Sequence, residues 1–217
     1  MVKLILLFTV TACPTGRNIG TVLREVVANH PEVALVTKYV EIDVEETNRY
    51  RIKQNPTVLF LDGNGQEICR LTGMQETEQV EAALQLVNSG NGNVQREQYE
   101  ENQAKVESYT IYLYQHQELL PVQIEYDNQT GIGAPRITAV QLMLKAQRSG
   151  YENPFPQGTK LLHVHFPAGK GRIVLQTTHE VDVETEQRMH KALQATLSHF
   201  QVAEIELIIE GAKEEVQ

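Results

Sequence analysis

Hydrophobic and polar positions follow two different periods along this chain, and the periods predict its helices and strands. Residues 4–10 form a mainly apolar run of strand length, a pattern typical of a strand buried on both faces. After Cys13 and Pro14 the apolar residues recur at helical spacing, at Ile19, Val22, Leu23, Val26 and Val27. This pattern predicts an amphipathic helix that ends near His30 and Pro31.

The rest of the first half predicts further strands and helices. A β-branched run at 33–43 indicates a strand, and the polar segment 45–54 indicates a short helix that ends before Pro56. Residues 57–61 and 67–71 flank the turn residues 62–65 and predict a hairpin. The last helix is expected to have Thr77 as its N-cap and Val80, Leu84 and Val87 on its buried face. The order is βαβαββα within residues 1–88, which favours a mixed sheet flanked by helices.

A polar segment at 89–107, rich in Asn, Gly, Gln and Glu, predicts a linker to a second domain. The pattern beyond it predicts strands at 109–114 and 119–126, a helix at 136–147, a hairpin of 160–166 with 172–177, a helix at 185–200 and a strand at 204–210. Gln147 is expected on the buried face of the first of these helices. We therefore expect a two-domain α+β protein, with a ββαββαβ domain at 108–212 and an acidic tail at 213–217.

Charge and cysteine content narrow the classes of function. The chain carries a net charge of −9 and has no cluster of Lys and Arg, so we expect no nucleic-acid partner. No apolar run reaches the ~18 residues that a membrane span needs. Two cysteines, Cys13 and Cys69, are too few for a disulfide-stapled scaffold. The oligomeric state stays open at this point.

The position of Cys13 allows two interpretations of the N-terminus. If residues 4–10 are a strand, Cys13 lies at the start of a helix, where the helix dipole favours a thiolate. The same residues also fit a short lipoprotein signal that ends in Val10-Thr11-Ala12-Cys13. Because the apolar core is shorter than most signal segments, we expect an uncleaved strand and a cytoplasmic protein. The alternative is an extracytoplasmic lipoprotein anchored at Cys13.

The first half resembles the thioredoxin superfamily in its motifs and in the order of its elements. The matching segments are 6–17 (LLFTVTACPTGR), 40–43 (VEID), 55–63 (NPTVLFLDG) and 71–73 (LTG). The resemblance implies that Pro56 is cis and faces the Cys13 thiol across a substrate groove. It also implies binding roles for neighbouring residues, namely Thr15, Gly16, Asn55 and Thr57.

The first half departs from that family at the residues that assist the thiol. Gly16 stands in the position of the second, resolving cysteine, so an internal thiol cannot release a mixed disulfide. Ala12 replaces the usual Trp, and Leu7 replaces a buried acid. Cys13 could still form mixed disulfides with a low-molecular-weight thiol or a protein partner. We favour the other interpretation, a scaffold or partner-binding surface without turnover, and we expect Cys69 to be a core residue.

The second half resembles the GerMN domain of sporulation and spore-germination proteins. The resemblance lies in residues 111–114 (IYLY), 119–122 (LLPV), 139–144 (AVQLML), 155–162 (FPQGTKLL) and 202–211 (VAEIELIIEG). It implies a module of protein or envelope assembly, without catalytic residues. We therefore expect a non-enzymatic interaction or assembly protein of a spore-forming bacterium, with a monothiol redox protein as the alternative.

The histidines do not predict a metal centre. His163 and His165 lie two residues apart and share one strand face, and His179 follows them. No carboxylate or cysteine nearby completes a ligand set, and an exposed strand face accounts for the pair. We therefore expect neither a metal nor another cofactor.

Overall fold

The computed structural model describes residues 1–90 and 103–211 and divides the chain into two compact units. The first comprises the described residues of Met1–Lys105 together with Asn128–Ile132, and the second those of Val106–Asp127 and Gly133–Gln217. Most of the predicted linker, and the predicted tail at 213–217, lie outside the described residues.

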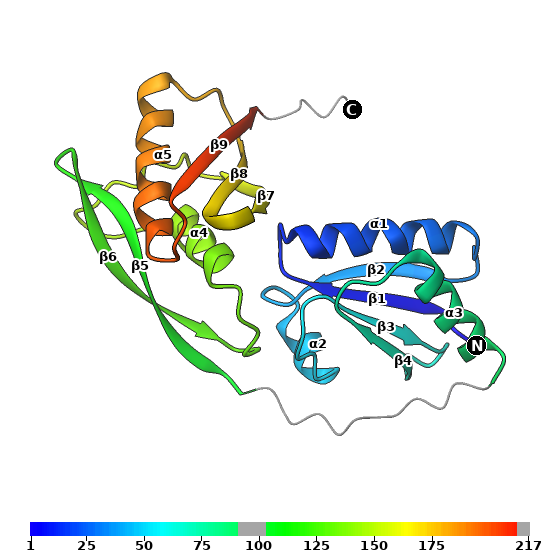
Figure 1. The fold of residues 1–217 in the computed structure, drawn as a ribbon. Helices are drawn as coiled ribbons and strands as arrows, with labels where there is room; N and C mark the ends of the chain where they lie inside the picture. Colours follow the sequence, from blue (N-terminus) through cyan, green and yellow to red (C-terminus); the bar gives the residue numbers. More distant parts are fainter. Residues whose placement is uncertain (91–102, 212–217) are drawn as a thin grey trace. The chain divides into compact units, whose positions relative to one another are not determined.

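In the part of the chain that the structure describes, the first unit is a four-stranded mixed sheet flanked by three helices (Figure 1). Its elements are β1 (Leu4–Thr9), α1 (Pro14–Ala28), β2 (Ala34–Tyr39), α2 (Val44–Arg49), β3 (Thr57–Leu61), β4 (Glu67–Thr72) and α3 (Thr77–Asn88). The strand order is β2-β1-β3-β4, with β1 parallel to β2 and antiparallel to β3. The predicted order βαβαββα is confirmed.

Strand β1 is an interior strand, buried on both faces as the apolar run predicts. Ile5 and Leu7 face α1 and α3, where they share a core with Leu23 and Leu84. Phe8 points to the opposite face, because side chains alternate along a strand, and its ring lies 6.0 Å from that of Tyr50. Both faces of β1 therefore contribute to the core, and the strand fixes where Cys13 lies.

Strand β2 and helix α2 are shorter than the elements predicted there. The strand predicted at 33–43 ends at Tyr39, because the N–H groups of Ile42 and Asp43 donate to the Tyr39 carbonyl and close a turn. The helix predicted at 45–54 ends at Arg49, and Arg51 has a positive φ of 49° that a helix cannot continue through.

The predicted N-cap of the third helix is wrong by one residue. Glu76 is the N-cap of α3, and its N–H donates to the side chain of Gln79 at 2.8 Å. The Thr77 hydroxyl instead donates to Glu25 of α1 at 3.2 Å. A Glu at this position is not among the preferred N-caps, which is why the pattern favoured Thr77.

The second unit contains a two-stranded and a three-stranded sheet within the described residues (Figure 1). Its elements are β5 (Lys105–Gln115), β6 (Glu118–Asn128), α4 (Pro135–Lys145), β7 (Lys160–His165), the 3₁₀ turn η1 (Pro167–Gly169), β8 (Lys170–Thr177), α5 (Val183–Ser198) and β9 (Glu204–Gly211). Strands β7 and β8 form an antiparallel hairpin, and α5 connects β8 to the parallel strand β9. The predicted order ββαββαβ is confirmed.

Strand β5 and helix α4 of the second unit have other bounds than the prediction gives them. Strand β5 starts at Lys105, inside the segment 89–107 that composition assigns to the linker. Helix α4 ends at Lys145, so Gln147 lies beyond it and is exposed. The Asn153 amide accounts for this end, because it donates to the carbonyls of Met143 and Ala146 at 2.8 and 3.0 Å.

Candidate functional site

Cys13 lies at the junction between the buried strand β1 and helix α1. Its N–H donates to the Val10 carbonyl at 3.1 Å, and Ala12 has a positive φ of 61°, so the chain turns sharply after the strand. Cys13 is the N-cap of α1, with Pro14 in the first helical turn. Its side chain is half-buried, so the thiol is partly open to solvent.

The Asn55 side chain connects this junction to the loop before β3. Its Oδ1 accepts from the Val10 N–H at 3.1 Å and from the Thr9 hydroxyl at 3.0 Å. A backbone N–H requires an acceptor opposite it, so the orientation of the amide is fixed. The Asn55 Nδ2 group consequently faces Cys13 and lies 3.5 Å from its Sγ. We call Thr9, Val10, Cys13 and Asn55 the Asn55 network.

Gly16 closes the space in which a second thiol would lie. A Cβ placed on Gly16 would lie 1.9 Å from Oγ1 of Thr9 and 2.7 Å from its Cβ. The Thr9 side chain is 4 % exposed and is held by Asn55, so it cannot move aside without loss of that hydrogen bond. Any side chain at position 16, a cysteine included, would therefore require rearrangement of the Asn55 network.

The remaining predicted site residues lie around the same junction. The Asn55–Pro56 peptide bond is cis, and Pro56 is buried. The buried Thr57 donates its hydroxyl to the Gln54 carbonyl at 2.7 Å, which fixes the loop on the other side of Pro56. Thr15 is half-buried in the first turn of α1.

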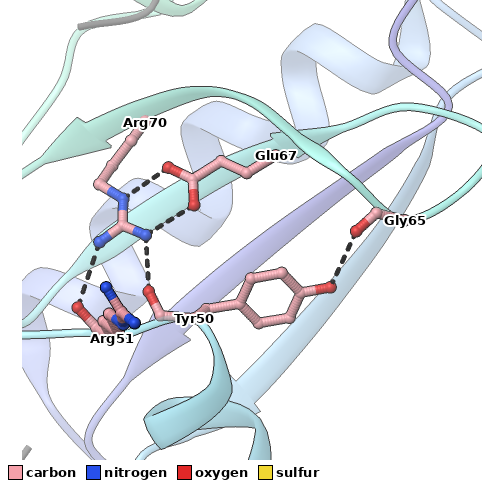
Figure 2. Close-up of polar contacts among 5 residues, drawn as sticks. All are labelled: Tyr50, Arg51, Gly65, Glu67 and Arg70. Carbon is pink, nitrogen blue, oxygen red and sulfur yellow. Dashed lines mark hydrogen bonds and ion pairs between the residues drawn. The ribbon is translucent and has the colours of Figure 1, made fainter. Parts of the chain in front are cut away.

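A second cluster, the Arg70 network, holds the chain between α2 and this loop. Figure 2 shows the Arg70 guanidinium between the Glu67 carboxylate and the carbonyls of Tyr50 and Arg51. The Glu67 contact is bidentate, at 2.8 and 2.7 Å, and the Arg70 side chain is 9 % exposed. The Tyr50 hydroxyl donates to the Gly65 carbonyl at 3.3 Å. These bonds fix the loop that leads into Asn55.

Cys69 is too distant to serve as a partner for Cys13. Phe60 pairs with both Ile5 and Cys69, so Cys69 lies at the level of Ile5, two strands away from β1. From Ile5 to Thr9 the strand advances ~13 Å, whereas a disulfide needs Cα atoms within about 7 Å. Cys69 packs against the hydrophobic core, and burial raises the pKa of its thiol.

The sequence did not single out Thr9 as a site residue, although a signal was present. Thr9 is the one polar residue within the apolar run 4–10. A buried hydroxyl requires a hydrogen-bond partner, and Asn55 before Pro56 supplies it. The contact joins the end of β1 to the loop before β3, 46 residues further along the chain, and so only the fold reveals it.

The histidine pair lies on strand β7 within the described residues, 1–90 and 103–211. His163 is half-buried and His165 exposed on β7, on the face that carries Val174 and Arg172. In that part of the chain no three His, Cys, Asp or Glu side chains are grouped as metal ligands. None of its helices has the length and apolar content to cross a bilayer.

Comparisons with known proteins separate the two halves of the chain. Residues 110–215 match the family model described as Germane: Sporulation and spore germination. Solved structures similar to the chain include Fasciola hepatica thioredoxin, at 26 % identity over 38 % of this chain and 78 % of that one, with a TM-score of 0.35. Another is reduced desulfothioredoxin from Desulfovibrio vulgaris Hildenborough, at 23 % identity over 38 % and 78 %, with a TM-score of 0.35. No curated protein matches.

The family match and the order of elements in the first unit each bear on one of the two resemblances. The second half carries a Germane (GerMN) domain, which is associated with sporulation and spore germination. The first unit has the thioredoxin-like order of elements that the sequence predicts.

Proposed function

We propose that the protein is a non-enzymatic interaction or assembly protein of sporulation or germination, and that its thioredoxin-like unit binds a protein partner without redox turnover. The observation that carries this proposal is the packing of Gly16 on Thr9, 1.9 Å from a Cβ placed on the glycine. This packing fills the place of the resolving thiol, and Cys69 lies too far away to replace it. Without a second thiol, a disulfide exchanged onto Cys13 has no internal route of release.

Genetic complementation in the native host tests the proposal. A chain with Cys13→Ser keeps a hydroxyl in place of the thiol, and Ser is a favoured N-cap, so the fold is retained. We expect C13S to restore sporulation and germination as fully as the unmodified chain does, as should the control C69S. Loss of function in C13S, with C69S active and both proteins present at normal levels, would overturn the proposal.

The second candidate is a monothiol redox protein, favoured by the Asn55 Nδ2 donor at 3.5 Å from the half-buried Cys13 Sγ. In that reaction the Cys13 thiolate attacks a low-molecular-weight disulfide, forms a mixed disulfide and releases one thiolate. A second external thiol then attacks the mixed disulfide and regenerates Cys13. Intact-mass measurement after incubation with glutathione disulfide distinguishes the candidates. A stoichiometric adduct that external thiol removes repeatedly supports this one, and absence of an adduct supports the first.

We further propose that residues 4–9 stay in the mature protein, which then works in the cytoplasm. The burial of Ile5, Leu7 and Phe8 in an interior strand supports this, since cleavage before Cys13 would remove that strand from the core. Intact mass of the protein from its native host is the test. A mass that starts at Cys13 with a lipid attached would establish the alternative, an extracytoplasmic anchor.

A further inference from the structure

A pocket in the second unit lies where the first turn of α4 meets the end of α5. Its volume is about 540 Å³, within the range of about 300–1,000 Å³ that ligand sites occupy. It is lined by Arg136, Ile137, Phe166, His199, Phe200 and Gln201, together with the residues that open α4. Pro135, His199 and Gln201 are exposed at its rim, whereas Phe166, Phe200 and Arg136 are half-buried below them. The pocket is thus open to solvent and has an aromatic floor.

The pocket holds its only guanidinium in a fixed position. Arg136 Nη2 donates to the Phe200 carbonyl at 3.0 Å, and the guanidinium carbon lies 5.3 Å from the Phe166 ring centroid. One hydrogen bond and one ring contact fix the group but use few of its five N–H donors. Because the guanidinium is already ordered, anion binding costs little side-chain entropy at Arg136.

Charge distinguishes this pocket from the rest of an acidic protein. None of the residues that line it is acidic, although the chain carries 28 Asp and Glu. His199, whose Nε2 lies 3.3 Å from the Tyr112 hydroxyl, adds a second nitrogen side chain at the rim. The first turn of α4 also lines the pocket, and the positive end of its helix dipole favours a negative charge there. A ligand that fits both the aromatic floor and the positive charge of this pocket has an anionic group next to an apolar group.

We propose that this pocket binds a carboxylate carried on an aromatic or aliphatic group. The carboxylate pairs with the Arg136 guanidinium, and the apolar group packs against the rings of Phe166 and Phe200. The chemistry is shared by a free organic acid and by the C-terminal residue of a peptide. It is independent of Cys13 and of the function proposed above.

NMR titration of the full chain with a matched pair of probes tests the proposal. The probes are 3-phenylpropionate and 3-phenylpropionamide, which differ in the negative charge. We expect saturable amide shifts confined to residues 134, 136, 137, 166 and 199–201, with 3-phenylpropionamide binding at least fivefold more weakly than 3-phenylpropionate. Equal affinity of the two probes, shifts elsewhere, or no saturation up to 20 mM, about the weakest binding worth assigning to a site, would overturn the proposal.

Variants and a third probe complete the test. Arg136→Gln should weaken 3-phenylpropionate at least fivefold, whereas Arg172→Gln, on the exposed face of β8, should leave its affinity unchanged. N-acetyl-L-phenylalanine represents a peptide C-terminus. If it binds more tightly than 3-phenylpropionate the natural source is a peptide, and if it does not bind the source is a free acid. Equal effects of the two Arg variants would contradict the assignment of Arg136.

Discussion

The Arg70 network and the Asn55 network, both in the first unit, differ in the exposure of the group at which each one ends. The Arg70 network is closed, since the guanidinium is 9 % exposed and binds a carboxylate and two carbonyls within the same fold. The Asn55 network has a buried beginning, Thr9, but ends on the half-buried sulfur of Cys13. A closed network can only stabilise the fold. A network that ends at a partly exposed group can also change when a binding partner contacts that group.

This difference shows which polar cluster is a candidate for function. Strength of interaction is not the criterion, because the ionic Arg70 network is the stronger of the two. The distinguishing feature is whether the last atom of the network can meet a partner. Substitutions in these two networks, and one in a third polar cluster, test the comparison in order of decreasing expected effect.

Removal of Arg70 tests whether its network is purely structural. Arg70→Met leaves Glu67 and the carbonyls of Tyr50 and Arg51 without their donor, so we expect a loss of about 3 kcal/mol of unfolding free energy. Urea unfolding measures it, with the exposed Arg24→Met as control, expected within about 0.5 kcal/mol of the unmodified chain. The rate at which a thiol reagent modifies native Cys13 should not change. A change in that rate would show that the two networks are coupled.

The packing of Gly16 against Thr9 is tested by adding one methyl group. Gly16→Ala places a Cβ 1.9 Å from the Thr9 hydroxyl oxygen, and we expect a cost of about 2 kcal/mol from overpacking. Gly20→Ala is the matched control on the same helix. Its Cβ would meet Leu7 at 3.5 Å, an ordinary contact, and alanine favours the helix by up to about 1 kcal/mol.

A double mutant shows whether that cost arises from Thr9. In a Thr9→Ala background the Gly16→Ala substitution should cost clearly less than it does alone, because the clashing oxygen is absent. Additive effects of the two substitutions would show that Gly16 is required for another reason. The steric argument against a resolving thiol would then fail.

Asn55 is the residue at which stability and thiol reactivity can be separated. Asn55→Asp keeps an acceptor for Val10 and Thr9 but replaces the donor that faces Cys13 with an anionic oxygen. We expect a stability loss of about 1 kcal/mol or less, together with a several-fold slower modification of Cys13 by Ellman's reagent at pH 7. Asn55→Ala should cost more stability. Unchanged modification in N55D would place the Asn55 amide outside the thiol's environment.

The sequence predicts the order of the elements well because the periods of its apolar residues differ between strands and helices. It predicts element ends less well, since these depend on single contacts from elsewhere in the chain. The Asn153 amide binds the last carbonyls of α4, and the hydrogen bond from the Asp43 N–H to the Tyr39 carbonyl closes the turn at the end of β2. The same limit applies to the site. Cys13, Pro56 and Asn55 were identified by motif, whereas the role of Thr9 depends on a contact with residue 55 that local pattern does not contain.

The smallest expected effect concerns a third polar cluster, in which one member titrates. His30 Nε2 lies 2.9 Å from Glu81 and Nδ1 3.6 Å from Glu32, and the hydrogen bond with Glu81 is the main cause that raises the His30 pKa above 6.5. A raised pKa in the folded state stabilises the protonated form. The resulting stability is fully present below about pH 6.5 and is lost as the pH rises through the folded-state value.

Comparison of the unmodified chain with His30→Gln at two pH values measures this contribution. At pH 5.5 we expect the unmodified chain to be more stable by less than about 1 kcal/mol, because the His30 side chain is a quarter exposed and its ion pairs are screened. At pH 8.5 the ionic part of the difference should vanish. A difference that persists at pH 8.5 would mean that neutral His30 makes the same contribution through its hydrogen bond alone. The cluster would then behave like the closed Arg70 network, whose strength does not depend on a titrating group near neutral pH.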